Sequence, residues 1–243
     1  MGGFRFPRAE LLAGALIATL TAGWAAAQSL PAGTASPDGH AHEFFEREVV
    51  QIMSKTRIPT NRHLKRTALR RSNEADRRHA AEIVLQMRAA LEDFKDYRVA
   101  EQAGYQIFFP GLDLPRTHFA NDRAGLIGSL WFRPSKPTTL LYRKTRKGYE
   151  LVGALYTASQ FASESELNRR VPLSVARWHA HVNICMPPEQ SSIASDWKKF
   201  GFEGSIDSEE ECQKANGNFY PQMFGWMLRV FPFEKSFDKI WEQ

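Results

Sequence analysis

The chain has 243 residues, of which 43% are hydrophobic and 24% are charged, and its formal net charge is +5. The 17 Phe, 6 Trp and 6 Tyr exclude a wholly disordered chain, because they supply enough apolar surface for a core. Two Cys are too few for a disulfide-framework mini-protein or an all-cysteine zinc site.

Residues 1–27 have the layout of a secretory signal peptide. Two arginines precede an apolar run from Leu11 to Trp24, and three alanines then match a cleavage pattern of small residues. The alternative is a membrane anchor, but a run of about 17 residues is at the short end for a span. We therefore predict cleavage before Gln28 and a periplasmic or secreted location, with no transmembrane span after cleavage.

Export changes how the two cysteines are interpreted. In an oxidising compartment, Cys185 and Cys212 are expected to form a disulfide rather than to act as a catalytic thiol or a metal ligand. Closing a loop of this length would stabilise the fold by about 3–4 kcal/mol.

The first part of the mature chain is predicted to be helical. Residues 41–56 and 74–103 carry apolar side chains at steps of three and four, which is typical of amphipathic helices. Asn73 is a suitable N-cap for the second helix, and Gly104 is a suitable stop. These segments predict a helical arm over residues 41–103.

The remainder of the chain is predicted to be rich in strands. Aromatic and β-branched runs predict strands, and the connection at 145–148 is typical of a hairpin. The predicted strands are 105–109, 138–144, 149–157, 174–184 and 223–233, with short helices at 206–215 and 236–243. Helices followed by strands indicate an α+β fold with a mainly antiparallel sheet over residues 104–243. Residues 28–40, rich in small residues, are predicted to be a flexible linker.

The clearest chemical motif is a His-x-His pair on a predicted strand. His179 and His181 would present two imidazoles on one face, because strand residues two apart share a face. Such a pair can hold zinc, copper or iron if further ligands arrive, and His118 is the third candidate. Asn183 or Glu150 could support the ligands. The alternative is a pair of solvent-facing histidines without a metal.

The other histidines are weaker candidates. A solvated or capping role is expected for His63 and His79, which lie in and beside the basic segment 55–78. His40 and His42 form a second pair, but ordering a flexible segment around a metal costs entropy.

Other functional classes have little support. The chain lacks the G-x-S-x-G, P-loop, G-x-G-x-x-G and H-E-x-x-H motifs. The basic segment 55–78 has few interleaved aromatic residues, so we expect no nucleic-acid partner. A solvated arm that can contact anionic lipid or polysaccharide is the favoured interpretation.

Several short motifs resemble a family of exported bacterial proteins whose activity is uncharacterised. The motifs are Gly104-Tyr105, His118-Phe-Ala-Asn121, residues 137–142, residues 149–153, the block VPLSVARWHAHVNIC over 171–185, and Phe224-Gly-Trp-Met227. The resemblance implies one secreted module in which His118, His179 and His181 belong to one pattern. It also implies that some members carry His where this chain has Arg229, so that a fourth ligand would be missing here.

The leading hypothesis is an exported metal-binding protein that uses His118, His179 and His181. It includes a metalloenzyme acting on an unknown small molecule, since a bound metal can activate water. The alternative is a non-catalytic periplasmic module without metal that binds an envelope component.

Overall fold

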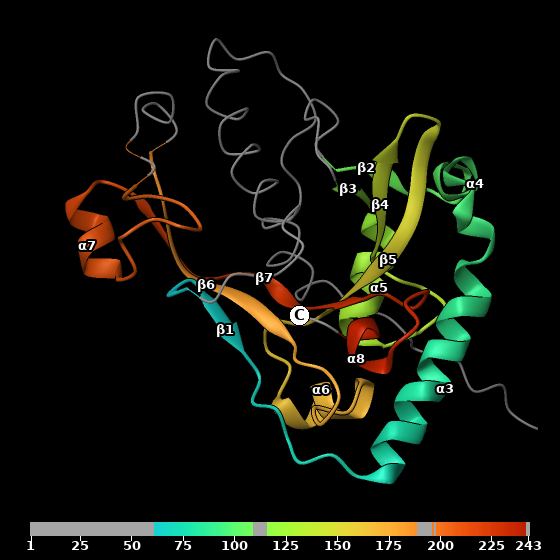
Figure 1. Cartoon of the computed structure of the whole chain (residues 1–243). Coiled ribbons are helices and arrows are strands. Elements are labelled where there is room, and N and C mark those ends of the chain that lie inside the picture. Colours follow the sequence, from blue (N-terminus) through green and yellow to red (C-terminus); the bar gives the residue numbers. More distant parts are fainter. Residues whose placement is uncertain (1–60, 109–115, 189–195, 197, 242–243) are drawn as a thin grey trace, which may run out of the picture. The chain divides into compact units, whose positions relative to one another are not determined.

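A seven-stranded sheet organises the protein (Figure 1). The computed structural model describes residues 61–108, 116–188, 196 and 198–241. In chain order the elements are β1 (Leu64–Arg66), α3 (Glu74–Leu91), the 3-10 helix η1 (Asp93–Lys95), α4 (Tyr97–Gln102), β2 (Gln106–Ile107), β3 (Arg116–Ala120), α5 (Asp122–Leu130), β4 (Thr139–Thr145), β5 (Gly148–Ala158), α6 (Glu164–Arg170), β6 (His179–Met186), α7 (Glu209–Lys214), β7 (Asn218–Val230) and α8 (Phe237–Ile240).

The strands lie in the order β1-β6-β7-β5-β4-β3-β2, and every neighbouring pair is antiparallel. The α+β class and the antiparallel sheet are therefore confirmed. The predicted helix at 41–56 lies outside the described residues. The structure also places a strand, β1, within the segment predicted as a helical arm, and this strand pairs with β6 at one edge of the sheet.

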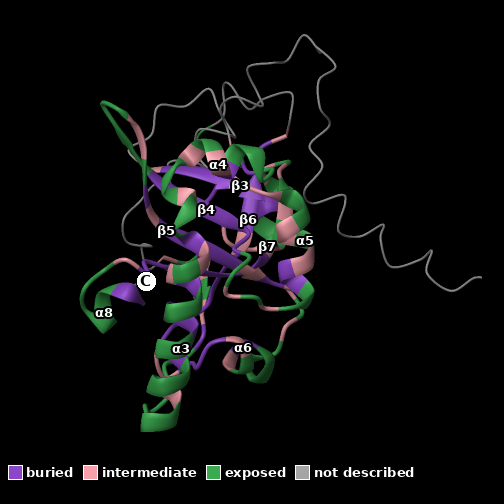
Figure 2. Ribbon diagram, turned by 90° about the vertical axis from the view of Figure 1, so that its right-hand side faces the viewer, coloured by how far each residue is buried: buried purple, intermediate pink, exposed green. Residues whose placement is uncertain are grey.

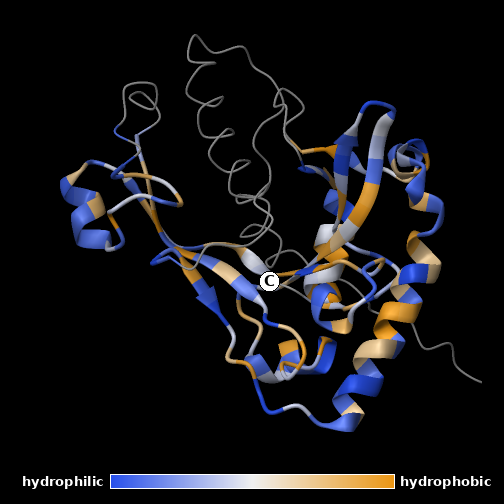
Figure 3. Cartoon of the chain, viewed as in Figure 1, coloured by the Kyte–Doolittle hydropathy of each residue, from blue (hydrophilic) through white to orange (hydrophobic). Residues whose placement is uncertain are grey.

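One face of the sheet forms the main core with α3. The helix contributes a buried stripe at helical spacing, including Ile83, Met87 and Leu91. The strands contribute alternate residues such as Tyr142 and Leu228 to the same cluster. Figure 2 shows the strands largely buried and the outer side of α3 exposed, and Figure 3 shows the matching alternation of apolar and polar residues along α3. This burial supplies the main driving force for the fold.

The predicted helix over 74–103 begins and ends as expected but is not continuous. The Asn73 side chain accepts a hydrogen bond of 2.8 Å from the Asp76 backbone N–H, and Gly104 has a φ of +88° just beyond α4. Between these ends the helix stops at Leu91, and Asp96 caps a new helix by accepting from the Arg98 N–H. The prediction of one helix was wrong because both pieces present apolar residues to the same core, which preserves the pattern across the break.

The strands β4 and β5 of the hairpin begin and end within two residues of the predicted bounds. The short helix α7 begins three residues later than predicted and ends one residue earlier. Four other strands differ from the prediction, and one of them is β3, which carries His118 and lies where no strand was predicted. β2 is two residues long, β6 begins at His179 rather than 174, and β7 begins at Asn218, five residues early. The late start of β6 has a local cause, because the Trp178 N–H donates to the Thr67 side chain at 3.1 Å instead of to a strand.

The predicted disulfide is confirmed. Cys185 of β6 and Cys212 of α7 are bonded, with their Cα atoms 5.6 Å apart. Gly217 lies against this bridge, and a Cβ added there would be 2.6 Å from the Cys185 sulfur and 2.8 Å from the Met186 carbonyl oxygen. The bridge therefore fastens α7 to β6, and the chain just before β7 passes so close to it that only a glycine fits at position 217.

Across the described ranges, none of the helices combines the length and the apolar character needed to span a bilayer.

Replacing both cysteines by Ala should lower the free energy of unfolding by about 3–4 kcal/mol, because the bond closes a loop across a separation of 27 residues. Urea denaturation under non-reducing conditions measures this change. Gly217→Ala should also destabilise the protein while leaving the bridge chemically intact. A loss below about 1 kcal/mol for the double cysteine variant would contradict the prediction.

Candidate functional site

Five polar side chains lie on the face of the sheet opposite the main core. They are Arg116 and His118 of β3, His179 and His181 of β6, and Arg229 of β7. Their sequence neighbours Phe119, Ala180 and Leu228 point to the other face and belong to the core cluster around α3. Since side chains alternate along a strand, the five residues share one surface, which we call the histidine face.

The histidine face has its own apolar floor. Leu141, Leu155, Met227 and Phe231 form a separate buried cluster on this side of the sheet. Leu141 is the register partner of His118, and Leu155 is the partner of Arg229. The polar groups are therefore set among apolar side chains, where electrostatic interactions are stronger than in water.

The predicted His-x-His pair is present and buried. His179 and His181 are 2% and 8% exposed, and their ring centres are 5.9 Å apart. The His181 ring also packs edge-to-face on Phe202, with 5.0 Å between ring centres. The alternative of two solvent-facing histidines therefore does not hold.

A bulge in β7 shapes the strand opposite this pair. His179 pairs with Met227 and His181 pairs with Met223, so two steps on β6 correspond to four on β7. Phe224 has a φ of +68°, and a Cβ on Gly225 would collide with the Ala158 carbonyl. Bulges of this kind redirect side chains and are frequent beside functional sites.

Arg229 connects the two histidine-bearing strands electrostatically. Burial, followed by the charges of Arg229 and Arg116, lowers the pKa of His118 to about 3. Burial, followed by the charges of Arg229 and His63, lowers the pKa of His181 to about 4. Arg229 therefore lies within electrostatic reach of both imidazoles, which are neutral at pH 7.

The pKa of Arg229 is itself shifted. It is 4% exposed, and burial and the nearby charge of Arg116 lower its pKa to about 10. It remains a cation at pH 7. In the sequence, Arg229 stands out as a single charged residue inside the apolar run at 223–233. Only the family resemblance connects this position to the predicted metal site.

His63 is not the solvated residue that the sequence predicted. It is 1% exposed. Its Nδ1 lies 2.9 Å from the Asn183 carbonyl oxygen and its Nε2 lies 2.8 Å from the Gly204 carbonyl oxygen. Both partners are acceptors, so both contacts are satisfied only when both ring nitrogens carry a proton. The ring thereby links β1 to β6 and to the loop before α7.

The predicted metal ligands are brought together only in part. His179 and His181 are neighbours, whereas β7, β5 and β4 separate β6 from β3 and thus from His118. Among the described residues, no three His, Cys, Asp or Glu side chains form a group that could hold a metal ion. The three-histidine site therefore stays a prediction. His40 and His42 lie outside the described residues.

The two proposed supporting residues have other contacts. The Asn183 backbone carbonyl accepts from His63, and Asn183 has a φ of +56°. The Glu150 carboxylate pairs with Arg143 at 2.6 Å on an exposed part of the β4–β5 hairpin. Neither contact connects these side chains to the predicted ligands.

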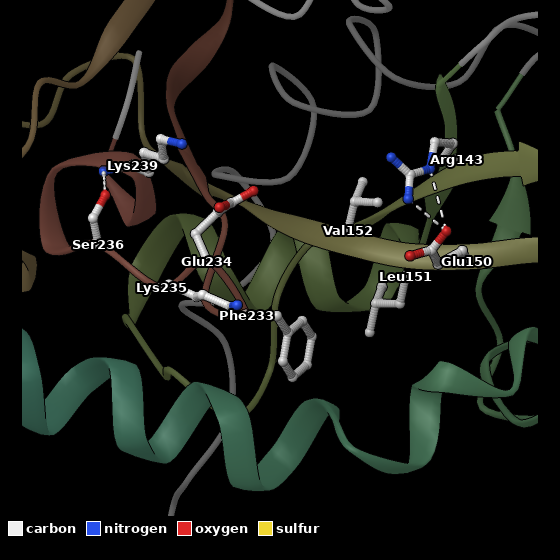
Figure 4. A pocket seen from close by; sticks show the side chains of 9 residues that line it. All are labelled: Arg143, Glu150, Leu151, Val152, Phe233, Glu234, Lys235, Ser236 and Lys239. Atoms are coloured by element: carbon white, nitrogen blue, oxygen red, sulfur yellow. Dashed lines mark hydrogen bonds and ion pairs between the residues drawn. The ribbon is translucent and has the colours of Figure 1, made fainter.

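A separate cleft of about 390 Å³ lies between this hairpin and the chain before α8 (Figure 4). The Arg143–Glu150 ion pair forms one wall, and Lys239 belongs to the opposite side. The Phe233 ring packs against the main core and lies 4.9 Å from the Lys95 ammonium. The cleft holds charges of both signs near open solvent, so it favours no one class of ligand.

Comparisons with protein-family models, with curated proteins and with solved structures find no match for this chain.

The buried histidine should make the metal-free protein sensitive to acid. The pKa of His118 is about 3 in the folded protein and 6.5 in its usual environment, so between these values the unfolded chain binds more protons. Stability should then fall as the pH drops below about 6.5, by up to about 1.4 kcal/mol per pH unit for this residue.

Urea denaturation of the EDTA-treated protein at several pH values measures this slope. His118→Gln should lower the number of protons taken up on unfolding by about one in this pH range. The control His79→Gln, on the exposed side of α3, should leave the slope unchanged. Equal slopes in the parent and His118→Gln would show that the buried imidazole does not take up the proton on unfolding.

Proposed function

We propose that this is an exported protein that binds one transition metal ion on the histidine face. His179 and His181 are the primary ligands, His118 is the third, and the metal is zinc, copper or iron. The observation that carries the proposal is the pair of buried rings with centres 5.9 Å apart. Two imidazoles that share an ion through bonds of 2.0–2.1 Å have ring centres up to about 6 Å apart, so the separation suits a shared ion.

The state of the histidines also supports the proposal. A metal binds the neutral imidazole, and burial holds His118 and His181 in this form by lowering the pKa of each. The buried Nε2 of His118 has no hydrogen-bond partner among the residues that the structure describes, which suits a ligating nitrogen. A third ligand would have to close the distance from β3 to β6, and the sheet order makes this the demanding step.

The second candidate is a binding module without a metal. The specific observation that favours it is Arg229, whose charge acts on both His118 and His181. A fixed cation at this place repels a metal ion and favours a ligand of the opposite charge. The two candidates make opposite predictions about metal content.

Replacing His179 and His181 by Ala should abolish stoichiometric binding of zinc or copper, because the two adjacent ligands are lost together. Elemental analysis after loading and desalting measures the metal, and far-UV circular dichroism should remain unchanged. His79→Ala is the matched control on an exposed helix surface, and replacing His40 and His42 should do little. A parent protein that retains no metal, or a double variant that retains as much, would favour the metal-free module.

Export is the second part of the proposal, supported by the Cys185–Cys212 bond, since disulfides persist in oxidising compartments. Mass spectrometry of the protein recovered from its native cell should show a mature N-terminus at or near Gln28. A cytoplasmic protein that starts at Met1 would contradict it.

A further inference from the structure

Two arginines from distant strands share the histidine face. Arg116 begins β3 and Arg229 lies near the end of β7, with β4 and β5 between them. The Arg116 guanidinium nevertheless lies 5.2 Å from the centre of the Phe231 ring. Phe231 follows Arg229 by two residues and belongs to the apolar floor of the same face. This contact directs the Arg116 guanidinium across the sheet toward β7.

A glycine makes this reach possible. Gly153 lies on β5 between Leu141 of β4 and β7, and a Cβ there would be 2.8 Å from the Phe231 ring and 2.7 Å from the Val230 carbonyl oxygen. The missing side chain lets the Phe231 ring lie over β5. The Phe231 ring can then contact the Arg116 guanidinium through a cation–π interaction.

The two guanidinium groups repel each other. Arg116 is half-buried, and burial and the charge of Arg143 lower its pKa. The charge of Arg116 in turn lowers the pKa of Arg229. Two like charges that share a partly apolar face attract an anion that can interact with both of them.

Two polar nitrogen atoms of this face have no hydrogen-bond partner within the described part of the chain. They are the Nη1 atom of Arg116 and the Nε2 atom of His118, and both are buried. His118 is 3% exposed and lies within electrostatic reach of both arginines. A buried donor that lacks an acceptor is costly, and an oxygen-rich anion supplies acceptors for both atoms at once.

We propose that Arg116, Arg229 and His118 bind a small oxyanion, a carboxylate, phosphate or sulfate group, on the histidine face. The arginines supply the charge, and the His118 Nε2–H donates to one oxygen. The site shares the face of the proposed metal centre but does not require a metal. In the metal-free protein the His118 nitrogen donates a proton to the anion, whereas as a metal ligand it offers its lone pair.

Isothermal titration of the EDTA-treated full chain with phosphate, sulfate and acetate tests the proposal. Titration with chloride at equal ionic strength provides the baseline. We expect saturable binding of at least one oxyanion and a rise in Tm of about 3 °C at about ten times Kd. Acetate distinguishes a carboxylate site from one for a tetrahedral anion.

Arg229→Gln and Arg116→Gln should each weaken this binding at least about tenfold, because each removes a charge-assisted hydrogen bond. Arg133→Gln, an exposed arginine in the segment between α5 and β4, is the matched control and should bind as the parent does. If Arg229→Gln does not fold, Arg116→Gln at the start of its strand keeps the test decisive.

The outcomes separate this proposal from the proposed function. Oxyanion binding without metal, lost in Arg116→Gln, supports the arginine site even if the protein never binds zinc. Binding that appears only after zinc is added and is unchanged in Arg116→Gln would overturn the arginine site and leave the metal proposal standing. No specific binding in the parent protein would also overturn it.

Discussion

The pairing of β7 with both β5 and β6 is the interaction on which the structure depends. The strands β2, β3, β4 and β5 form one half of the sheet, and β1 and β6 form the other half. Among the described residues, β7 is the only strand that joins the two halves. The residues of β7 serve both faces at once, with Leu228 in the main core and Arg229 on the histidine face. Without this central strand, His118 and His181 would belong to two separate pieces of sheet.

The central strand is also irregular where the two halves meet. The bulge at Phe224 and Gly225 lets β7 pair with β5 through Met227 and Trp226 and with β6 through Met223. The close approach of Gly225 to the Ala158 carbonyl means that a larger residue would push the strands apart. A bulge costs regular ladder hydrogen bonds, and it persists only where the surrounding packing requires it. Here it sets the spacing of the strand that lies beside His179.

The histidine face concentrates groups that a sheet usually presents to water. Burying an arginine and three imidazoles carries a desolvation cost, which His118 and His181 reduce by staying neutral. Arg229 cannot lose its charge at pH 7, since its pKa is still about 10. A fold selected only for stability would place apolar residues here. The two proposals rest on different groups of this face: neutral nitrogens suit a metal, and guanidinium groups suit an oxyanion.

The sequence by itself determined part of the local structure. The alternating pattern at 138–157 predicted the hairpin, the Asn73 cap predicted the start of α3, and the two cysteines, interpreted on the expectation of export, predicted their bond. These features depend on residues close in the chain or on a pairing with one possible solution. The tertiary structure alone decided that β7 is central, that His63 is buried, and that Arg116 reaches Phe231 across two strands. Such contacts join residues far apart in the chain, and no local pattern specifies them because their geometry arises from strand order and from gaps such as Gly153.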